Sequence, residues 1–366
     1  KHDGSCVDDA GNLHRYFKCA LGAGSFVKMN KVTCGRSLGD ALGERYVGID
    51  APSYTKIDDP LHILPGAFVT TAKGHVKPIG FHGEHKVRTY QQLSKVDAVA
   101  VRDDTIATIE PSIGASIGHV VEVDLQDNLL YKWAELAVLT VNVSGLKTLL
   151  LHGNRMQEIT QAVADALPPL CYSGLRTLAL NACNIKSWAS IQRLAPFLPN
   201  IEELYLSGNS LEDLPRSVAM AKWGEATGNV DGSLSTVFTG ININTGDAKR
   251  DTDTMQHSQT LPALPTGSWA ELRVLDLSGC NLDEWSQLLY FATLPCLEEV
   301  LLDGNPLENI LPCVAGGFTN LSRMSCSSTM LKQWSDIDAI ATYSGMSNLR
   351  LSHIPLFSGR GASEVR

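Results

Sequence analysis

The sequence predicts an α/β fold in which short repeats stack into a solenoid. Three observations carry this prediction: one leucine pattern recurs about nine times, its copies keep a nearly constant spacing, and the leucines alternate as in short strands. The pattern is L-x-x-L-x-L-x-x-N-x-L, and its copies span 96–106, 120–130, 146–156, 175–185, 201–211, 272–282, 297–307, 321–331 and 346–356. The first and last copies, VDAVAVRDDTI and MSNLRLSHIPL, are the weakest. We therefore predict a leucine-rich-repeat solenoid over residues 93–366.

The ninth position of the pattern, called the slot here, is expected to lie in the turn after each strand. It is filled in order by Asp104, Asn128, Asn154, Cys183, Asn209, Cys280, Asn305, Thr329 and Ile354. An asparagine there can hydrogen-bond backbone groups that the turn leaves unpaired, and cysteine or threonine can do so in part. Ile354 cannot, so we expect the last turn to be irregular or to need an outside contact.

One interval between slots is much longer than the others and predicts an insertion. Successive slots are 24, 26, 29, 26, 71, 25, 24 and 25 residues apart. The inserted residues, about 222–268, are rich in Gly, Thr, Ser, Asn and Asp and show no apolar periodicity. Such a segment cannot bury enough apolar surface to order itself, so we expect a disordered loop. Before the repeats, residues 41–92 are predicted to be a linker and the lead-in to the first repeat.

Composition excludes several classes of function. The net charge of −9 argues against nucleic-acid binding, and no run of 18 apolar residues that could span a membrane is present. Nine cysteines include no C-x-x-C pair, which favours reduced thiols in a cytosolic protein and no metal site.

Signals for catalysis are weak. GASIG (114–118) places Ser116 in a G-x-S-x-G pattern, but the strand-then-helix context is reversed. His82 and His85 form at most a metal pair without a third ligand nearby. We therefore predict no enzyme and no cofactor, and keep a hydrolase using Ser116 as a remote alternative.

Residues between the strand leucines are expected to face the concave side of the solenoid. The predicted binding surface there comprises Glu122, Asp124, His152, Glu203, Tyr205, Asp276, Glu299 and Asp303. The early and middle repeats are acidic on this face, and the last ones are basic. A curved face of this kind is typical of protein binding.

The first 40 residues form a different unit. HRYFKCALGAGSFVKMNKV (14–32) predicts strands at 16–19 and 26–27 around a turn that carries Gly22 and Gly24. A lone hairpin is marginal in water, so we expect its partner strands to precede Lys1.

This segment resembles the second half of a CAP-Gly β-barrel. The motifs are KHDG (1–4), in place of the family's Gly-Lys-Asn-Asp-Gly, YFKC (16–19) and GSFVKMNKV (24–32).

 The last of these motifs runs from Gly24 to Val32. A CAP-Gly half followed by leucine-rich repeats resembles the tubulin folding cofactor E family, and RYVG (45–48), KPIGF (77–81) and QQLSKV (91–96) are similar to its linker.

The resemblance implies a non-enzymatic cofactor in tubulin heterodimer assembly and disassembly and in microtubule biogenesis. It implies that α-tubulin's acidic C-terminal tail binds the CAP-Gly part, and that the repeats engage the tubulin body together with other folding cofactors and β-tubulin. Carried over by position, the tail-binding residues are Lys1, His2, Asp3, Gly4, Phe17, Ser25, Phe26 and Lys28. The family's complete barrel and its C-terminal ubiquitin-like domain lead us to expect a chain truncated at both ends.

The expected location is the cytoplasm, in association with the cytoskeleton. The alternative function is a generic leucine-rich-repeat scaffold at the cytoskeleton that does not bind the tubulin tail.

Overall fold

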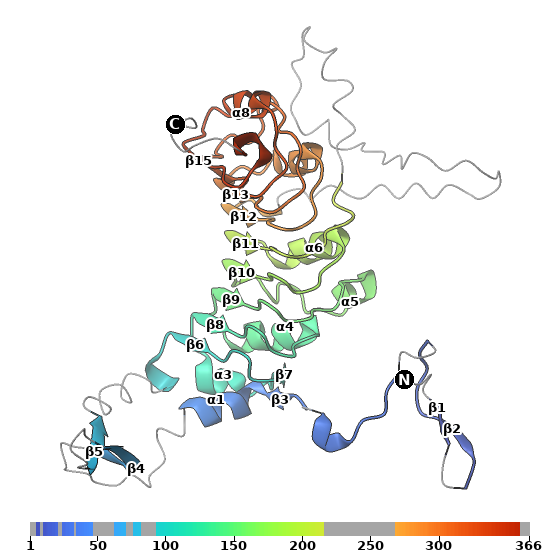
Figure 1. Cartoon of the computed structure of the whole chain (residues 1–366), viewed down its shortest axis with the longest axis vertical. Coiled ribbons are helices and arrows are strands. Elements are labelled where there is room, and N and C mark those ends of the chain that lie inside the picture. Colours follow the sequence, from blue (N-terminus) through green and yellow to red (C-terminus); the bar gives the residue numbers. More distant parts are fainter. Residues whose placement is uncertain are drawn as a thin grey trace.

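A parallel sheet of nine strands forms the spine of the molecule (Figure 1). The computed structural model describes residues 5–7, 10–20, 24–32, 34–46, 62–70, 76–81, 93–215 and 268–358. The strands of the spine are β6 (Ala98–Ala100), β8 (Glu122–Asp124), β9 (Thr148–Leu150), β10 (Thr177–Ala179), β11 (Glu203–Tyr205), β12 (Val274–Asp276), β13 (Glu299–Leu301), β14 (Arg323–Ser325) and β15 (Asn348–Arg350). Each of the nine copies of the leucine pattern supplies one strand, so the predicted leucine-rich-repeat fold is confirmed.

Short helices accompany the strands, and those of the middle repeats lie on the opposite side of the solenoid from the strands (Figure 1). They are the α-helices α3 (Ile113–Ile117), α4 (Trp133–Asn142), α5 (Gln161–Asp165), α6 (Trp188–Leu194) and α8 (Trp334–Ile340), and the 3₁₀ helices η3 (Leu93–Lys95), η4 (Ala195–Phe197), η7 (Trp285–Phe291) and η8 (Pro355–Phe357). Helices this short are not stable alone, so packing against the leucine core holds them.

The core is a continuous stack of leucines from one repeat to the next. The middle residue of each strand points inward, and from Val99 to Met324 these residues are at most 4% exposed. The next inward position, from Leu125 to Cys326, is fully buried in every repeat between them. Because each repeat buries its leucines against both neighbours, the core depends on stacking rather than on any single repeat.

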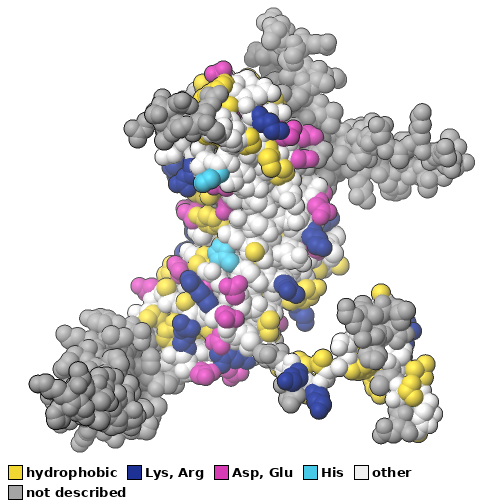
Figure 2. All heavy atoms as spheres, in the orientation of Figure 1, with side chains coloured by type: hydrophobic (Ala, Val, Ile, Leu, Met, Phe, Trp, Pro, Cys, Tyr) yellow, Lys and Arg dark blue, Asp and Glu magenta, His cyan; other side chains and the backbone are white. Residues whose placement is uncertain are grey.

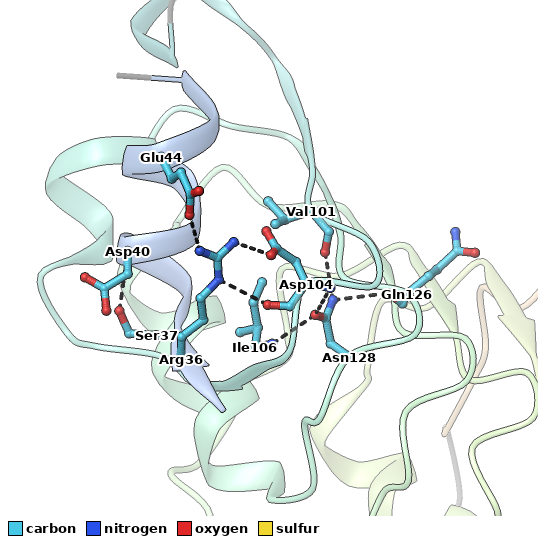
Figure 3. Close-up of polar contacts among 9 residues, drawn as sticks. All are labelled: Arg36, Ser37, Asp40, Glu44, Val101, Asp104, Ile106, Gln126 and Asn128. Atoms are coloured by element: carbon cyan, nitrogen blue, oxygen red, sulfur yellow. Dashed lines mark hydrogen bonds and ion pairs between the residues drawn. The ribbon is translucent and has the colours of Figure 1, made fainter. Parts of the chain in front are cut away.

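The slot residues hold the turns together as predicted. Asn128 is the most fully bonded: its Nδ2 donates to the carbonyl of Val101 at 2.7 Å, and its Oδ1 accepts from the backbone N–H groups of Asp104 and Ile106, each at 3.0 Å (Figure 3). Asn305 repeats the arrangement with the carbonyl of Leu277 at 2.8 Å. The asparagine side chains thus replace backbone partners that the curved turn lacks.

The cysteine and threonine slot residues make some of the same hydrogen bonds. The thiols of Cys183 and Cys280 donate to the carbonyls of Leu151 and Leu206, each at 3.2 Å. Burial raises the pKa of each of these two thiols to about 12. Thr329 makes one bond, from Oγ1 to the carbonyl of Cys326 at 2.8 Å.

The residue before the slot lies in the left-handed region of backbone conformation in all nine repeats. Its φ is between +49° and +72°, and only some repeats use glycine there, as at Gly153. His353 in the last repeat keeps this conformation, with φ +55°, although we expected that turn to be irregular or to need an outside contact. The turn stays regular because Ile354 is buried and fills the slot with apolar volume instead of hydrogen bonds.

The segment before the first repeat covers the N-terminal end of the solenoid. The sequence predicted a linker from residue 41, but Leu38–Tyr46 forms helix α1, whose Leu38, Ala41 and Leu42 are at most 1% exposed. The short strand β3 (Arg36–Ser37) pairs in parallel with β7 (Ile106–Thr108). The glycines in this segment suggested a linker, whereas packing against the first repeat stabilises a helix.

An arginine ties this covering segment to the first slot. The guanidinium of Arg36 forms ion pairs with Asp104, the first slot residue, and with Glu44 of α1 (Figure 3). Its Nε also donates to the carbonyl of Asp104 at 3.1 Å. Asp104 therefore faces an arginine where the inner repeats place an asparagine against backbone groups.

Two antiparallel hairpins precede the repeats. One pairs β1 (Ser5–Val7) with β2 (Leu13–Arg15), and the other pairs β4 (His62–Thr70) with β5 (Val76–Phe81). The strands predicted at 16–19 and 26–27 are wrong: these residues lie outside regular strands, with the 3₁₀ helix η1 (Met29–Lys31) just after them. The aromatic residues that suggested strands pack on one another instead. The CAP-Gly half-barrel stays a prediction, and the insertion predicted at about 222–268 lies almost entirely outside the described residues.

Candidate binding surface on the sheet face

The parallel register arranges the outward side chains of the sheet in columns. The first column contains Glu122, Thr148, Thr177, Glu203, Val274, Glu299, Arg323 and Asn348, and the second contains Asp124, Leu150, Ala179, Tyr205, Asp276, Leu301, Ser325 and Arg350. A third column, two residues beyond each strand, includes His152 and Asp303. All eight residues predicted for the concave surface lie in these columns, which we call the sheet face.

The middle of the sheet face is acidic and carries one aromatic side chain. Tyr205 OH donates to Glu203 Oε2 at 3.2 Å, and Thr177 Oγ1 donates to the same oxygen at 3.2 Å. Burial and the neighbouring Glu203 carboxylate raise the pKa of Tyr205 to about 12. The tyrosine therefore stays protonated at neutral pH and presents a half-buried ring that a partner could cover.

Several carboxylates of the sheet face already hold backbone or side-chain groups. Asp276 accepts from the N–H of Ser278 at 2.9 Å, and Asp303 accepts from the N–H of Ser327 at 2.6 Å. Asp124 is almost fully buried and forms an ion pair with Arg102. These residues shape the face, and the more exposed Glu122, Glu203 and Glu299 are the carboxylates a partner would meet first.

Charge changes sign along the columns. Arg323 Nε donates to Glu299 Oε2 at 2.7 Å, which links the acidic middle to the basic last strands. Figure 2 shows side chains of both signs along the strand side of the solenoid rather than one large patch of a single charge. Near the other end, burial lowers the pKa of His152, while Asp124 and Asp127 oppose this shift.

The residues predicted to bind a tubulin tail are only partly described. Lys1, His2, Asp3 and Gly4 lie outside the described residues. Phe17 and Phe26 do meet, with ring centroids 5.4 Å apart and 37% and 42% of each residue exposed. Ser25 and Lys28 are exposed beside them in sequence.

Tyr16, which was not among the residues predicted to bind the tail, belongs to this aromatic cluster. Its ring meets Phe26 edge-on at a centroid distance of 5.6 Å, and 68% of Tyr16 is exposed. The YF pair in the YFKC motif was the signal for it. Three aromatic rings that remain this exposed form an apolar surface rather than a buried core.

Neither a metal centre nor a nucleophile emerges from the part of the chain that the structure describes. No three His, Cys, Asp or Glu side chains there are grouped to hold a metal ion. Ser116 lies on the exposed side of α3 itself, not at the strand-to-helix turn that a nucleophile elbow needs. Among the described helices, none is long and apolar enough to cross a bilayer.

Comparisons with known proteins agree with the fold and identify relatives. Residues 271–292 match the family model described as Leucine Rich Repeat. Tubulin-specific chaperone E of Pongo abelii is 26% identical over 362 residues, which cover 96% of this chain and 56% of that protein. Tubulin-specific chaperone cofactor E-like protein of Rattus norvegicus is 25% identical over 266 residues, covering 72% of this chain and 50% of that protein.

Among solved structures, an internalin C2 from Listeria monocytogenes is similar, with a TM-score of 0.40 and 16% identity over 71% of this chain and 82% of that chain. The chain resembles tubulin-specific chaperone E along nearly its whole length, as its motifs predicted, and it spans little more than half the length of the Pongo abelii relative.

Proposed function

We propose that this chain is part of a tubulin folding cofactor that binds α-tubulin during assembly and disassembly of the tubulin heterodimer. The observation that carries the proposal is the similarity to tubulin-specific chaperone E over 96% of the chain. The repeat fold supports it, because a solenoid offers a long surface for a protein partner and no catalytic pocket is needed for such a role. The proposed partners include other folding cofactors and β-tubulin, and the proposed location is the cytoplasm with the cytoskeleton.

The sheet face is the surface we propose for the body of tubulin. Tyr205 lies midway along it. The partly exposed Glu203 is two residues earlier on the same strand, β11, and the partly exposed Glu299 lies on β13, two strands further along the sheet. A central aromatic side chain with a charged surround has the composition of an interface hot spot. Tyr205 is therefore the residue expected to contribute most to binding.

The aromatic cluster of Tyr16, Phe17 and Phe26 is the surface we propose for the acidic C-terminal tail of α-tubulin. Capture of a chain end needs an apolar contact together with cations or donors. The cluster supplies the apolar contact, and Lys28, two residues after Phe26, supplies a cation. Lys1, His2, Asp3 and Gly4 complete the proposed set.

Binding of purified αβ-tubulin to the immobilised chain tests both surfaces. We expect Tyr205→Ala to weaken binding about tenfold or more, as for an interface hot spot. The matched control is Glu271→Lys, an exposed residue outside the columns of the sheet face. Equal binding by the wild-type chain and by Tyr205→Ala, with both correctly folded, would remove the sheet face from the proposal.

The tail contact is tested separately with tubulin whose C-terminal tails have been removed by limited proteolysis. We expect tail removal and Phe26→Ala to weaken binding, and to do so without adding to each other because they remove the same contact. If neither tail removal nor Phe26→Ala changes binding but Tyr205→Ala still weakens it, the generic scaffold without tail binding becomes the better description. If the chain does not bind tubulin at all, the proposed function fails.

A further inference from the structure

The nine strands are joined by a regular ladder of backbone hydrogen bonds, and the ladder stops at β15 with its donors unused. In each earlier repeat, two N–H groups after the strand leucine donate to carbonyls of the following repeat. The last such pair runs from Cys326 to Arg350 at 2.9 Å and from Ser328 to Ser352 at 2.7 Å. The equivalent N–H groups of the last repeat, on Leu351 and His353, have no acceptor in the described part of the chain.

An acceptor is also left over at this edge. The carbonyl of Ser322 accepts from the N–H groups of both Ser347 and Asn348, at 2.9 and 3.0 Å. The equivalent carbonyl one repeat later belongs to Ser347, and among the described residues it receives no such pair. Two donors and one acceptor, spaced as in every other repeat, therefore face outward at the β15 edge. An edge of this kind is a template for another strand.

The leucines of the last repeat are also left partly uncovered. Leu349 and Leu351 are half-buried, whereas the equivalent residues of the earlier repeats are at most 4% exposed. An open pocket of about 390 Å³ lies at the turns that follow β14 and β15, and its apolar lining includes Met330, Ile354 and Phe357. The missing cover is thus apolar as well as hydrogen-bonding, which is what a further repeat would supply.

The positive charge of Arg350 at the β15 edge favours an acidic segment as the added strand. Arg350 is exposed on β15, and no carboxylate pairs with it in the part of the chain that the structure describes. Its neighbour Arg323, one strand back, pairs with Glu299. At the other end of the sheet, Arg102 and Asp124 of adjacent repeats form an ion pair across the face. Arg323 and Glu299 occupy directly opposed positions of neighbouring strands, so a carboxylate opposite Arg350 on a further strand would make the same kind of pair.

We propose that β15 is the docking edge for an extended, acidic segment of a partner protein, which adds to the sheet as a tenth parallel strand. Its carbonyls accept from the N–H groups of Leu351 and His353, and its own N–H groups donate to the carbonyl of Ser347. An apolar side chain of the segment covers Leu349 and Leu351, and its carboxylate pairs with Arg350. This is strand addition to a sheet edge, with main-chain bonds giving affinity and side chains giving selectivity. Of the sheet face it uses only Arg350, at the end of the columns, and neither Tyr205 nor the aromatic cluster takes part.

A synthetic peptide tests the proposal directly. The probe is VVEVDLQD, the chain's own residues 120–127, because the ladder register would place its first aspartate, which corresponds to Asp124, beside Arg350. Binding of the fluorescein-labelled peptide to the whole chain is followed by fluorescence anisotropy. We expect saturable binding, and at least tenfold weaker binding when the first aspartate of the peptide is replaced by lysine. Absence of saturable binding at millimolar peptide would overturn the proposal.

Two protein variants separate strand addition from adsorption of the peptide. Leu351→Pro removes one free N–H without removing an internal hydrogen bond, since proline is tolerated where an edge N–H faces solvent. Arg350→Glu reverses the charge at an exposed position. We expect each variant to bind the probe at least tenfold more weakly. The control Arg155→Glu, at an exposed position near the middle of the solenoid, should leave binding unchanged. Unaltered binding by a folded Leu351→Pro chain would rule out strand addition.

Two further measurements identify other occupants of the edge. Hydrogen exchange of the free chain should be fast at Leu351 and His353 and slow down when the probe is added. Protection before the probe is added would mean that the chain covers its own edge, and would overturn the proposal. A dimer in sedimentation velocity that the Leu351→Pro change dissociates would assign the edge to a second copy and overturn it equally.

Discussion

The two ends of the solenoid are built from similar repeats but are finished differently. At the N-terminal end, α1 buries Leu38, Ala41 and Leu42 against the first repeat, and Arg36 pairs with the first slot residue. At the C-terminal end, Leu349 and Leu351 stay half-buried and the backbone ladder has unused donors. The leucine pattern therefore makes a repeat able to stack but does not by itself bury its leucines. Burial comes from whatever lies next to it.

The largest expected contrast between the ends comes from truncating a leucine at each. Leu42→Ala should lower the free energy of unfolding by about 2–5 kcal/mol because it leaves a cavity under α1. Leu349→Ala should cost about 1 kcal/mol, since this side chain already lies partly in solvent. Urea unfolding followed by circular dichroism measures both. Equal losses would mean that the two ends are equally buried.

The slots give the next contrast. Asn128→Ala, near the covered end, removes an amide that bonds five backbone groups and should cost about 3 kcal/mol because buried polar groups are left unpaired. Thr329→Val, near the open end, removes one bond and should cost about 1 kcal/mol. Asn348→Ala, exposed on the outward face of β15, serves as the control with no measurable loss. A Thr329→Val loss as large as that of Asn128→Ala would contradict this ranking.

Thiol labelling sharpens the comparison without changing the overall fold. Cys183 and Cys280 are buried in the interior of the array, and Cys326 is equally buried but only one repeat from the open end. Burial raises the pKa of all three thiols, so each reacts only when the chain opens locally. If the open end frays, Cys326 should react with iodoacetamide about tenfold faster than Cys183. Exposed Cys34 provides the fast reference, and identical slow rates at the two buried positions would show that the open end does not fray.

The smallest expected effect belongs to His152, which lies between the two ends. Burial lowers its pKa in the folded chain, so below the unfolded-state value of about 6.5 the unfolded chain binds more protons. Stability from this residue is therefore complete above that pH and is lost as the pH falls toward the folded pKa. Urea unfolding at several pH values should show a shallower slope for His152→Gln than for the wild type. Identical slopes would mean that other groups set the pH dependence.

Most of the solenoid follows from the sequence because its interactions repeat. The strand positions follow from the alternation of leucines, and the asparagine slots follow from the need to pair backbone groups in each turn. Helix α1 was missed because its two glycines suggested a linker, although Leu38, Ala41 and Leu42 have helical spacing. The pairing of Arg36 with Asp104 joins residues 68 positions apart, and no local pattern announces such a contact.

The binding surfaces were predictable to different degrees. The columns of the sheet face follow from the period of two, which is why residues such as Glu203 and Tyr205 could be placed in advance. That Asp124 and Asp276 would be buried could not be foreseen, because it depends on which side chains neighbouring repeats lay over them. The open edge at β15 could not be predicted from the sequence either, because only the backbone hydrogen bonds between strands show which N–H groups remain unpaired.

The long interval between two slots has a practical consequence. Leu204 and Leu275 pair in the same register as any other neighbouring leucines, and Trp269, fully buried, lies just before the strand that resumes the sheet. The pairing of these two strands therefore does not depend on the number of residues that connect them. A reporter domain whose termini lie close together could be inserted into this interval. The pairing of β11 with β12 would then stay the same.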